Sequence, residues 1–277
     1  MSCASLVESD CPVPKAHQRL EDAHRLWHQT AASYTDPNDF REGLNETVKA
    51  LRGGTWALQQ ETRAGQSFGD WHAAWHRRIR GDEVLSWLVQ AHRHSISQAD
   101  LEEASTAQVT LAADAAGTPL VQFSVPPFID PALIPRQLRD SRMGSLVKEA
   151  SLMLLERSWA AGDLRSWELL EALAHCWAVL AAPLEAAHQN SEKGGLVPEA
   201  NSKFQIPNSF PLCMIVTRTA RTAVFRLHQG RIVKDHEAVG DELQGERPAA
   251  NLATDKDAGD DDDKPDPLRR LAWHFEE

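Results

Sequence analysis

The sequence predicts an α+β fold that is mainly helical, with an N-terminal antiparallel helical bundle followed by a smaller part that has short β-hairpins and two helices. Apolar residues recur at steps of three and four through about the first hundred residues, which is the period of an amphipathic helix. After residue 106 the period changes to the alternation that is typical of strands. The 277 residues are 42% hydrophobic, which is enough for a real core in one large or two ordinary domains.

We expect four parts along the chain. Residues 1–14 are small, polar and proline-containing and are expected to be disordered, and residues 15–105 form the bundle. Residues 106–234 form an α+β domain, and residues 235–277 form an acidic disordered tail with a short hydrophobic end. The net charge of the chain is −11, and residues 235–266 contain 12 acidic and 3 basic residues, so the rest is nearly neutral.

The first two helices of the bundle have clear apolar faces. One helix is expected over residues 15–33, and the next begins at the pair Asp36-Pro37, because Asp is a good N-cap and Pro suits the first helical position. Gly53 and Gly54 keep the phase of the second helix, and we expect them to let a neighbouring helix approach closely. The two faces consist of Leu20, Ala23, Trp27 and Ala31, and of Phe40, Leu44, Val48, Leu51, Thr55 and Leu58.

Residues 66–97 complete a bundle of three or four helices. Their apolar residues also recur at steps of three and four, and Gly81 interrupts the run. Asp82 follows and is well suited to accept the free N–H groups of a new first turn. We therefore expect two helices, or one bent helix, that meet at Gly81.

The stretch WLVQAHRHSISQADLE (residues 87–102) resembles the closing helix of HEPN-type helical domains, in which an Arg followed after four to six residues by a His cleaves RNA without a metal ion. Bacterial members of that family read roughly A-R-N-x-x-x-H-x-x-D-L-E there. The frame is kept by Ala91, Asp100, Leu101 and Glu102, whereas the Arg, Asn and His positions hold His92, Arg93 and Ser97. The resemblance covers residues 15–105 and implies a degenerate bundle without the catalytic pair.

The second half of the chain combines strands and helices. Val109, Leu111 and Ala113 alternate, as do Val121, Phe123 and Val125, and turn residues between them favour a hairpin. We expect one helix over residues 145–160 and a second that is capped by Asp163 and has Trp177 at its apolar centre. Residues 212–234 are rich in β-branched residues and predict two or three strands, with Gly230 at a positive φ in a hairpin loop of three or four residues.

Two pairs of histidines are candidate metal ligands. His24 and His28 lie one helical turn apart, as do His72 and His76, and such a spacing lets two imidazoles bind one metal ion. Neither pair has the intervening Glu of an H-E-x-x-H motif. The four cysteines are scattered without C-x-x-C pairing, which argues against a zinc knuckle, a redox motif or a disulfide framework.

A basic segment precedes the acidic tail. Residues 201–234 contain six basic residues and no acidic residue. The expected strands carry five candidates for contacts with nucleic-acid phosphates: Arg218, Arg221, Arg226, Arg231 and Lys234. The neighbouring tail either competes for this surface from a high local concentration or keeps the protein soluble.

No motif of a common enzyme class is present. The sequence has no G-x-S-x-G elbow, no Walker loop and no G-x-G-x-x-G after a strand. Its N-terminus carries acids where a signal peptide is basic, and no apolar run reaches the length of a membrane span, so we expect a cytoplasmic protein without a membrane partner. We assign no catalytic residue and no cofactor.

We therefore expect a non-catalytic binding or regulatory module, which the HEPN resemblance would associate with RNA or with toxin–antitoxin systems. Two alternatives stay open: a metal-dependent hydrolase that uses the bundle histidines, and an active HEPN-type ribonuclease with a displaced motif. The sequence does not identify the partner: a nucleic acid or a protein is compatible with it, and so is a homo-oligomer.

Overall fold

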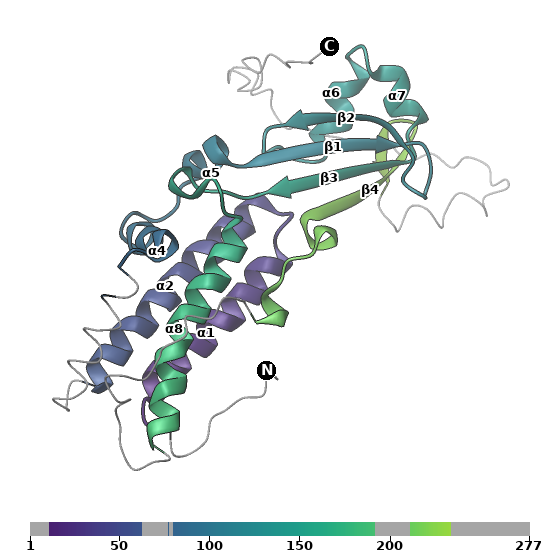
Figure 1. The fold of residues 1–277 in the computed structure, drawn as a ribbon. Helices are drawn as coiled ribbons and strands as arrows, with labels where there is room; N and C mark the ends of the chain where they lie inside the picture. Colours follow the sequence, from purple (N-terminus) through teal and green to yellow (C-terminus); the bar gives the residue numbers. More distant parts are fainter. Residues whose placement is uncertain (1–10, 63–76, 78–79, 192–210, 234–277) are drawn as a thin grey trace, which may run out of the picture.

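The computed structural model describes residues 11–62, 77, 80–191 and 211–233 of the chain. An elongated helical bundle lies at one end of an antiparallel sheet, and two short helices lie at the far end of that sheet (Figure 1). The fold is therefore mainly helical α+β, as the change of apolar period predicts. No described helix is long and apolar enough to cross a membrane.

The bundle is built from long helices that pack side by side. Helix α1 (Pro14–Ala32) is followed after a short turn by α2 (Pro37–Thr62), and α8 (Leu169–Ser191) packs against both (Figure 1). The predicted start of α2 is confirmed, because the Asp36 carboxylate accepts hydrogen bonds from the backbone N–H groups of Asn38 and Asp39, each at 3.0 Å.

Two shorter helices follow α2 along the chain. In α4 (Glu83–His94), the Asp82 carboxylate accepts from the N–H groups of Val84 and Leu85, which confirms the predicted N-cap. Helix α5 (Gln98–Ala104) comes next. The helix expected before Gly81 lies outside the described residues, apart from residue 77.

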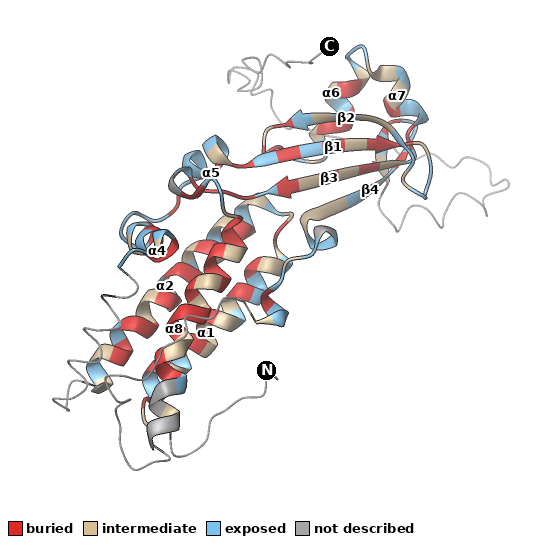
Figure 2. Cartoon of the chain, in the orientation of Figure 1, coloured by how far each residue is buried: buried red, intermediate tan, exposed pale blue. Residues whose placement is uncertain are grey.

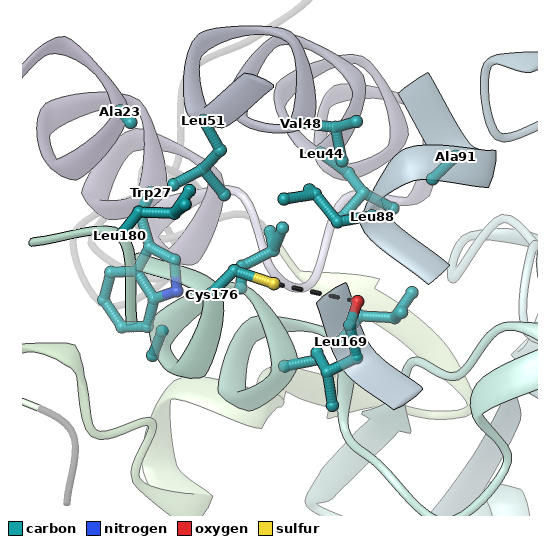
Figure 3. Close-up of a cluster of buried hydrophobic side chains, with 14 of the residues drawn as sticks. Ala23, Trp27, Leu44, Val48, Leu51, Leu88, Ala91, Leu169, Cys176 and Leu180 are labelled. Carbon is teal, nitrogen blue, oxygen red and sulfur yellow. Dashed lines mark hydrogen bonds between the residues drawn. The ribbon is translucent and has the colours of Figure 1, made fainter. Parts of the chain in front are cut away.

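The core of the bundle draws on both halves of the chain. Leu44, Leu51 and Leu88 pack with Leu180 between α2, α4 and α8, and the buried residues form a continuous stripe through the bundle (Figures 2 and 3). The Trp27 indole N–H donates to the backbone carbonyl of Leu170 at 2.8 Å, which gives this buried ring its polar partner. How the chain divides into independent domains stays a prediction.

Five antiparallel strands form the described sheet, in the order β2-β1-β3-β4-β5. Their inward residues, such as Leu111 and Met153, pack under two short helices, and these helices contribute Ile134, Leu138 and Val147 to the second core cluster. The strands are β1 (Thr106–Ala112), β2 (Pro119–Val125), β3 (Leu152–Ser158), β4 (Thr222–His228) and β5 (Arg231–Val233), and the short helices are α6 (Leu133–Arg139) and α7 (Gly144–Glu149). Three-residue or four-residue 3-10 helices occur at η1 (Gly162–Leu164), η2 (Leu212–Met214) and η3 (Arg218–Arg221).

Both predicted hairpins are present. Strands β1 and β2 pair from Ala107 with Val125 onward, as the alternating residues indicated. Strands β4 and β5 are joined by Gln229 and Gly230, whose φ angles are 49° and 73°. Two successive positive φ angles belong to a two-residue turn, so the loop is shorter than the three or four residues expected.

Two helix predictions in the second half are wrong. Residues 145–160 do not form one helix: α7 ends at Glu149, and the chain then enters β3, which pairs with both β1 and β4. Asp163 does not cap the next helix, because it lies in η1. The N–H groups of the first turn of α8 are instead bound by the Glu168 carboxylate, which accepts from Leu170 and Glu171.

Trp177 lies at the edge of the core and not at its centre. Its ring is only partly buried, and its indole N–H donates to the backbone carbonyl of Leu20 at 2.8 Å. Among the described tryptophans, the most enclosed indoles are those of Trp27 and Trp159, which are 2% and 0% exposed. Trp177 therefore pins α8 to α1 from the outside.

Candidate metal centre

A cluster of two histidines and one cysteine lies beside α1. His24 and His28 are one turn apart on the helix, and their Nε2 atoms are 3.2 Å from each other. Cys213 comes from η2, and its Sγ atom lies 3.3 Å from His24 Nε2. The three possible donor atoms all lie within 4.8 Å of one another. We call His24, His28 and Cys213 the α1 cluster.

Two tryptophans, one in the core and one at its edge, pack against the two imidazoles. The His24 ring lies 5.2 Å from the Trp177 ring, which its own hydrogen bond to Leu20 fixes on α1. The His28 ring meets Trp27 edge-to-face at 5.1 Å. Because both tryptophans are anchored by hydrogen bonds, the histidines lose little freedom when they bind a ligand together.

The donor set and its spacing fit a zinc ion. Cysteine sulfur and histidine nitrogen are the usual zinc ligands, and tetrahedral bonds of about 2.0–2.3 Å place neighbouring donors about 3.3–3.6 Å apart. The two distances to His24, 3.2 Å and 3.3 Å, come close to that range. Burial and the neighbouring His28 lower the pKa of His24, which favours the neutral imidazole that a metal ion requires.

The α1 cluster is open to solvent on one side. His28 and Cys213 are exposed, whereas His24 is half-buried. Three protein ligands leave one tetrahedral position for water or another donor. Within the described residues, no Asp or Glu oxygen joins these three donors.

The structure brings together only one of the two predicted histidine pairs. His24 and His28 share a site, whereas His72 and His76 lie outside the described residues. Cys213 was not predicted as a ligand. It is 189 residues from His24, and no local spacing pattern connects the two positions.

The basic candidates occupy different environments. The Arg221 guanidinium donates to Glu171 Oε1 at 2.6 Å and lies 4.0 Å from Glu168 Oε2, so it is committed to an internal ion pair. Arg226 and Arg231 are exposed and lie on the face of the sheet opposite the buried Leu227, by the β4–β5 register. The Arg218 side chain and all of Lys234 lie outside the described residues, and the nucleic-acid surface stays a prediction.

The buried acid next to Arg221 has a structural role. Burial raises the pKa of Glu168 to about 7, although Arg221 and hydrogen bonds oppose the shift. Its Oε1 accepts from the Tyr34 hydroxyl at 3.1 Å, and its Oε2 accepts from the backbone of α8. Both oxygens are thus used to start α8 and to hold the turn after α1.

Comparison with known proteins identifies the family. The family described as Bacteriophage lambda protein ea47 matches residues 4–259, which is most of the 277-residue chain. This chain belongs to the ea47 family. Protein ea47 of Escherichia phage lambda is 26% identical over 164 residues, which cover 57% of this chain and 39% of that protein. The chain thus matches about two fifths of the length of its curated relative, and no solved structure matches it.

Membership of the ea47 family overturns the HEPN resemblance. The retained A…DLE frame has a local explanation: Ser97 and Asp100 form a capping box at the start of α5, and Leu101 is fully buried. His92, at the position of the HEPN arginine, is exposed at the end of α4. A capped helix with a buried leucine is common to many bundles, so the short pattern did not specify a family.

Proposed function

We propose that this ea47 family member is a non-catalytic binding module that holds a zinc ion through His24, His28 and Cys213. The observation that carries the proposal is the convergence of two imidazole nitrogens and one sulfur at 3.2 Å and 3.3 Å from elements far apart in the sequence.

A zinc ion at this place would join two parts of the molecule. His24 and His28 belong to the bundle, whereas η2 lies on the segment that leads through η3 into β4. Met214, next to Cys213, is already fully buried in the bundle core. The ion would therefore fasten the segment before the sheet to α1 and would stabilise the native chain without chemistry of its own.

Metal analysis of the full-length protein tests the proposal. We expect Cys213→Ser and His28→Ala each to lose one equivalent of zinc relative to the unsubstituted chain. Added zinc should raise the melting temperature of the unsubstituted chain more than that of either variant, because only the native state offers the site. His92→Ala removes an exposed histidine outside the cluster and should leave the zinc content unchanged. Equal zinc content in all four proteins would refute the site.

The open side of the α1 cluster favours one alternative. A zinc ion with three protein ligands and a bound water is the arrangement of hydrolytic enzymes. Hydrolysis of bis-p-nitrophenyl phosphate by the zinc-loaded protein, lost on His28→Ala but kept on His92→Ala, would establish this activity. We expect no turnover, because no described carboxylate joins the cluster as a base.

A further inference from the structure

A second cluster of the same composition closes the other end of the bundle. Cys11 Sγ lies 3.5 Å from His17 Nδ1 and 3.4 Å from His188 Nε2. The three donor atoms lie within 4.8 Å of one another, and all three residues are half-buried. Cys11 precedes α1, His17 is in its first turns, and His188 is near the end of α8, 177 residues from Cys11.

His17 is oriented by a carboxylate behind it. Its Nε2 atom lies 3.5 Å from Glu21 Oε1, one turn further along α1, while its Nδ1 atom faces Cys11. Histidines that bind metal ions commonly give their second ring N–H to a carboxylate, which fixes the tautomer and the direction of the free nitrogen. Among the described residues, no carboxylate orients a histidine of the α1 cluster in this way. The second cluster therefore has an orienting partner that is not seen in the α1 cluster.

Negative charge surrounds the second cluster. Glu21 and Glu61 both act electrostatically on Cys11. The Glu61 carboxylate, at the end of α2, also accepts hydrogen bonds from the N–H groups of Lys15 and Ala16 at 2.8 Å and 2.9 Å. A divalent cation among these groups would offset the repulsion between them and a cysteine thiolate.

A catalytic Cys–His pair is the main competing explanation. A nucleophilic cysteine needs surroundings that favour the thiolate, such as a neighbouring cation or a helix N-terminus. Here Cys11 Sγ faces two imidazoles at once, those of His17 and His188. The described charged groups that contact this end of α1 are the carboxylates of Glu21 and Glu61, which do not stabilise a thiolate, so the geometry favours a shared metal ion over a nucleophile.

We propose that Cys11, His17 and His188 form a second zinc site, which clasps the start of α1 to the end of α8. It shares no ligand with the α1 cluster. His17 and His24 are seven residues apart on α1, which is about 10 Å along the helix axis. The two ions are thus too far apart for a dinuclear centre, whose metals lie about 3.5–4 Å apart. This second site makes two helices of the bundle, and the segment before the first of them, depend on one ion.

Cobalt titration of the full-length chain separates the two sites. Each site supplies one thiolate, so each bound Co²⁺ contributes one thiolate-to-cobalt absorption band. We expect Cys11→Ser to lose the band intensity of one thiolate and one equivalent of metal, whether or not the α1 cluster binds metal, because Cys213→Ser reports on that cluster separately. The double variant should lose the band entirely. If Cys11→Ser keeps the full band and the full stoichiometry, the second site does not exist.

Two further variants distinguish the loss of a metal ligand from a loss of folding. Cys11→His keeps a ligand and removes the sulfur, so it should retain its equivalent of metal while losing its share of the thiolate band. Glu21→Gln should weaken binding at the second site about tenfold or more and leave the α1 cluster unchanged. If Cys11→His loses neither band nor metal, or Glu21→Gln binds as tightly as the unsubstituted chain, the proposed ligands are wrong.

Discussion

Arg157 joins three separate backbone segments although it is completely buried. Its guanidinium donates to the carbonyls of Pro127 and Ile129, each at 2.8 Å, and to that of Thr35. Burial lowers its pKa to about 10, well above neutral pH, so the side chain stays charged. The turn after α1 and the proline-rich loop after β2 are thus held to β3 by one side chain.

Replacing Arg157 by Met should therefore destabilise the protein strongly. Three backbone carbonyls would lose their buried donor, and we expect a loss of about 3 kcal/mol or more in the free energy of unfolding. Urea unfolding measures the change. Arg165→Met removes an arginine whose ion pair with Glu103 is exposed, and should change stability by no more than about 0.5 kcal/mol. A small effect at Arg157 would mean that water replaces its hydrogen bonds.

Glu168 should make stability depend on pH in a direction opposite to that of an ordinary salt-bridged acid. Its pKa is raised to about 7 in the folded protein, whereas a glutamate in the unfolded chain titrates near about 4.3. At pH values between these two pKa values, Glu168 is protonated in the folded state and ionised in the unfolded state. The stabilisation from this group is complete below about pH 4.3 and is lost as the pH rises through about 7.

Residue 168 does not titrate in the variant Glu168→Gln, so the stability of this variant relative to the unsubstituted chain should rise from about pH 4.3 to about pH 7 and level off at higher pH. Urea unfolding at several pH values gives this difference. Glu103→Gln, at an exposed position, serves as the control for the loss of one carboxylate. A difference between the two proteins that stays constant with pH would show that the buried carboxyl does not titrate in this range.

At the scale of the elements, α1 leaves no room for a Cβ atom at Gly43 of α2, a glycine that sequence patterns do not single out. A Cβ atom at Gly43 would lie 2.6 Å from Thr30 Oγ1, whereas one at Gly53 would meet only Arg19 Cδ, at 3.8 Å. At Gly54, a Cβ would lie 3.3 Å from Leu20. The space that α1 leaves for a side chain on α2 is thus too small at Gly43, tight at Gly54 and sufficient at Gly53.

Gly43→Ala should separate the two helices and cost about 1–3 kcal/mol, because the added methyl group overlaps a buried threonine. Gly53→Ala lies in the same helix and should be neutral or stabilise the protein by up to about 1 kcal/mol, since Ala is the better helix former. Thermal unfolding of the two variants makes the comparison. Equal melting temperatures would show that α1 moves to accommodate the methyl group.

Local patterns predicted the elements wherever one face is polar. The β1–β2 hairpin alternates apolar with polar residues, and the caps at Asp36 and Asp82 need only a few neighbouring residues. Strand β3 was predicted as helix because it lies between β1 and β4, and both of its faces carry large apolar residues such as Met153 and Leu154. Pairing on both sides, which no local sequence records, decides its conformation.

At the scale of the whole molecule, only the two histidines of the candidate metal centre could be predicted from the sequence. The spacing of His24 and His28 on one helix indicates that both imidazoles bind the same metal ion. Cys213 could not be found, because only the packing of Met214 into the bundle brings its segment to α1. The same holds for Cys11 and His188, which meet because α1 and α8 lie side by side. Sites of this kind depend on contacts between distant parts of the chain.

The charge of the whole chain is concentrated beyond the sheet. Residues 235–266 carry a net charge of −9 out of −11, so a chain truncated after Lys234 keeps only −2. Because a net charge near zero promotes association, we expect the truncated chain to precipitate at a lower polyethylene glycol concentration than the full-length chain near neutral pH. Turbidity measured against polyethylene glycol concentration gives this comparison.

The same truncation decides whether the tail masks a phosphate-binding surface. We expect both forms to bind a DNA or RNA fragment equally weakly at about 50 mM salt, since Arg221 is already paired with Glu171 and only Arg226 and Arg231 are placed on one exposed face. Tight, salt-dependent binding by the truncated chain alone would contradict this expectation. If Arg226→Glu with Arg231→Glu then abolished that binding, the tail would be a competitor for the basic strands, because a tethered segment is present at about millimolar concentration.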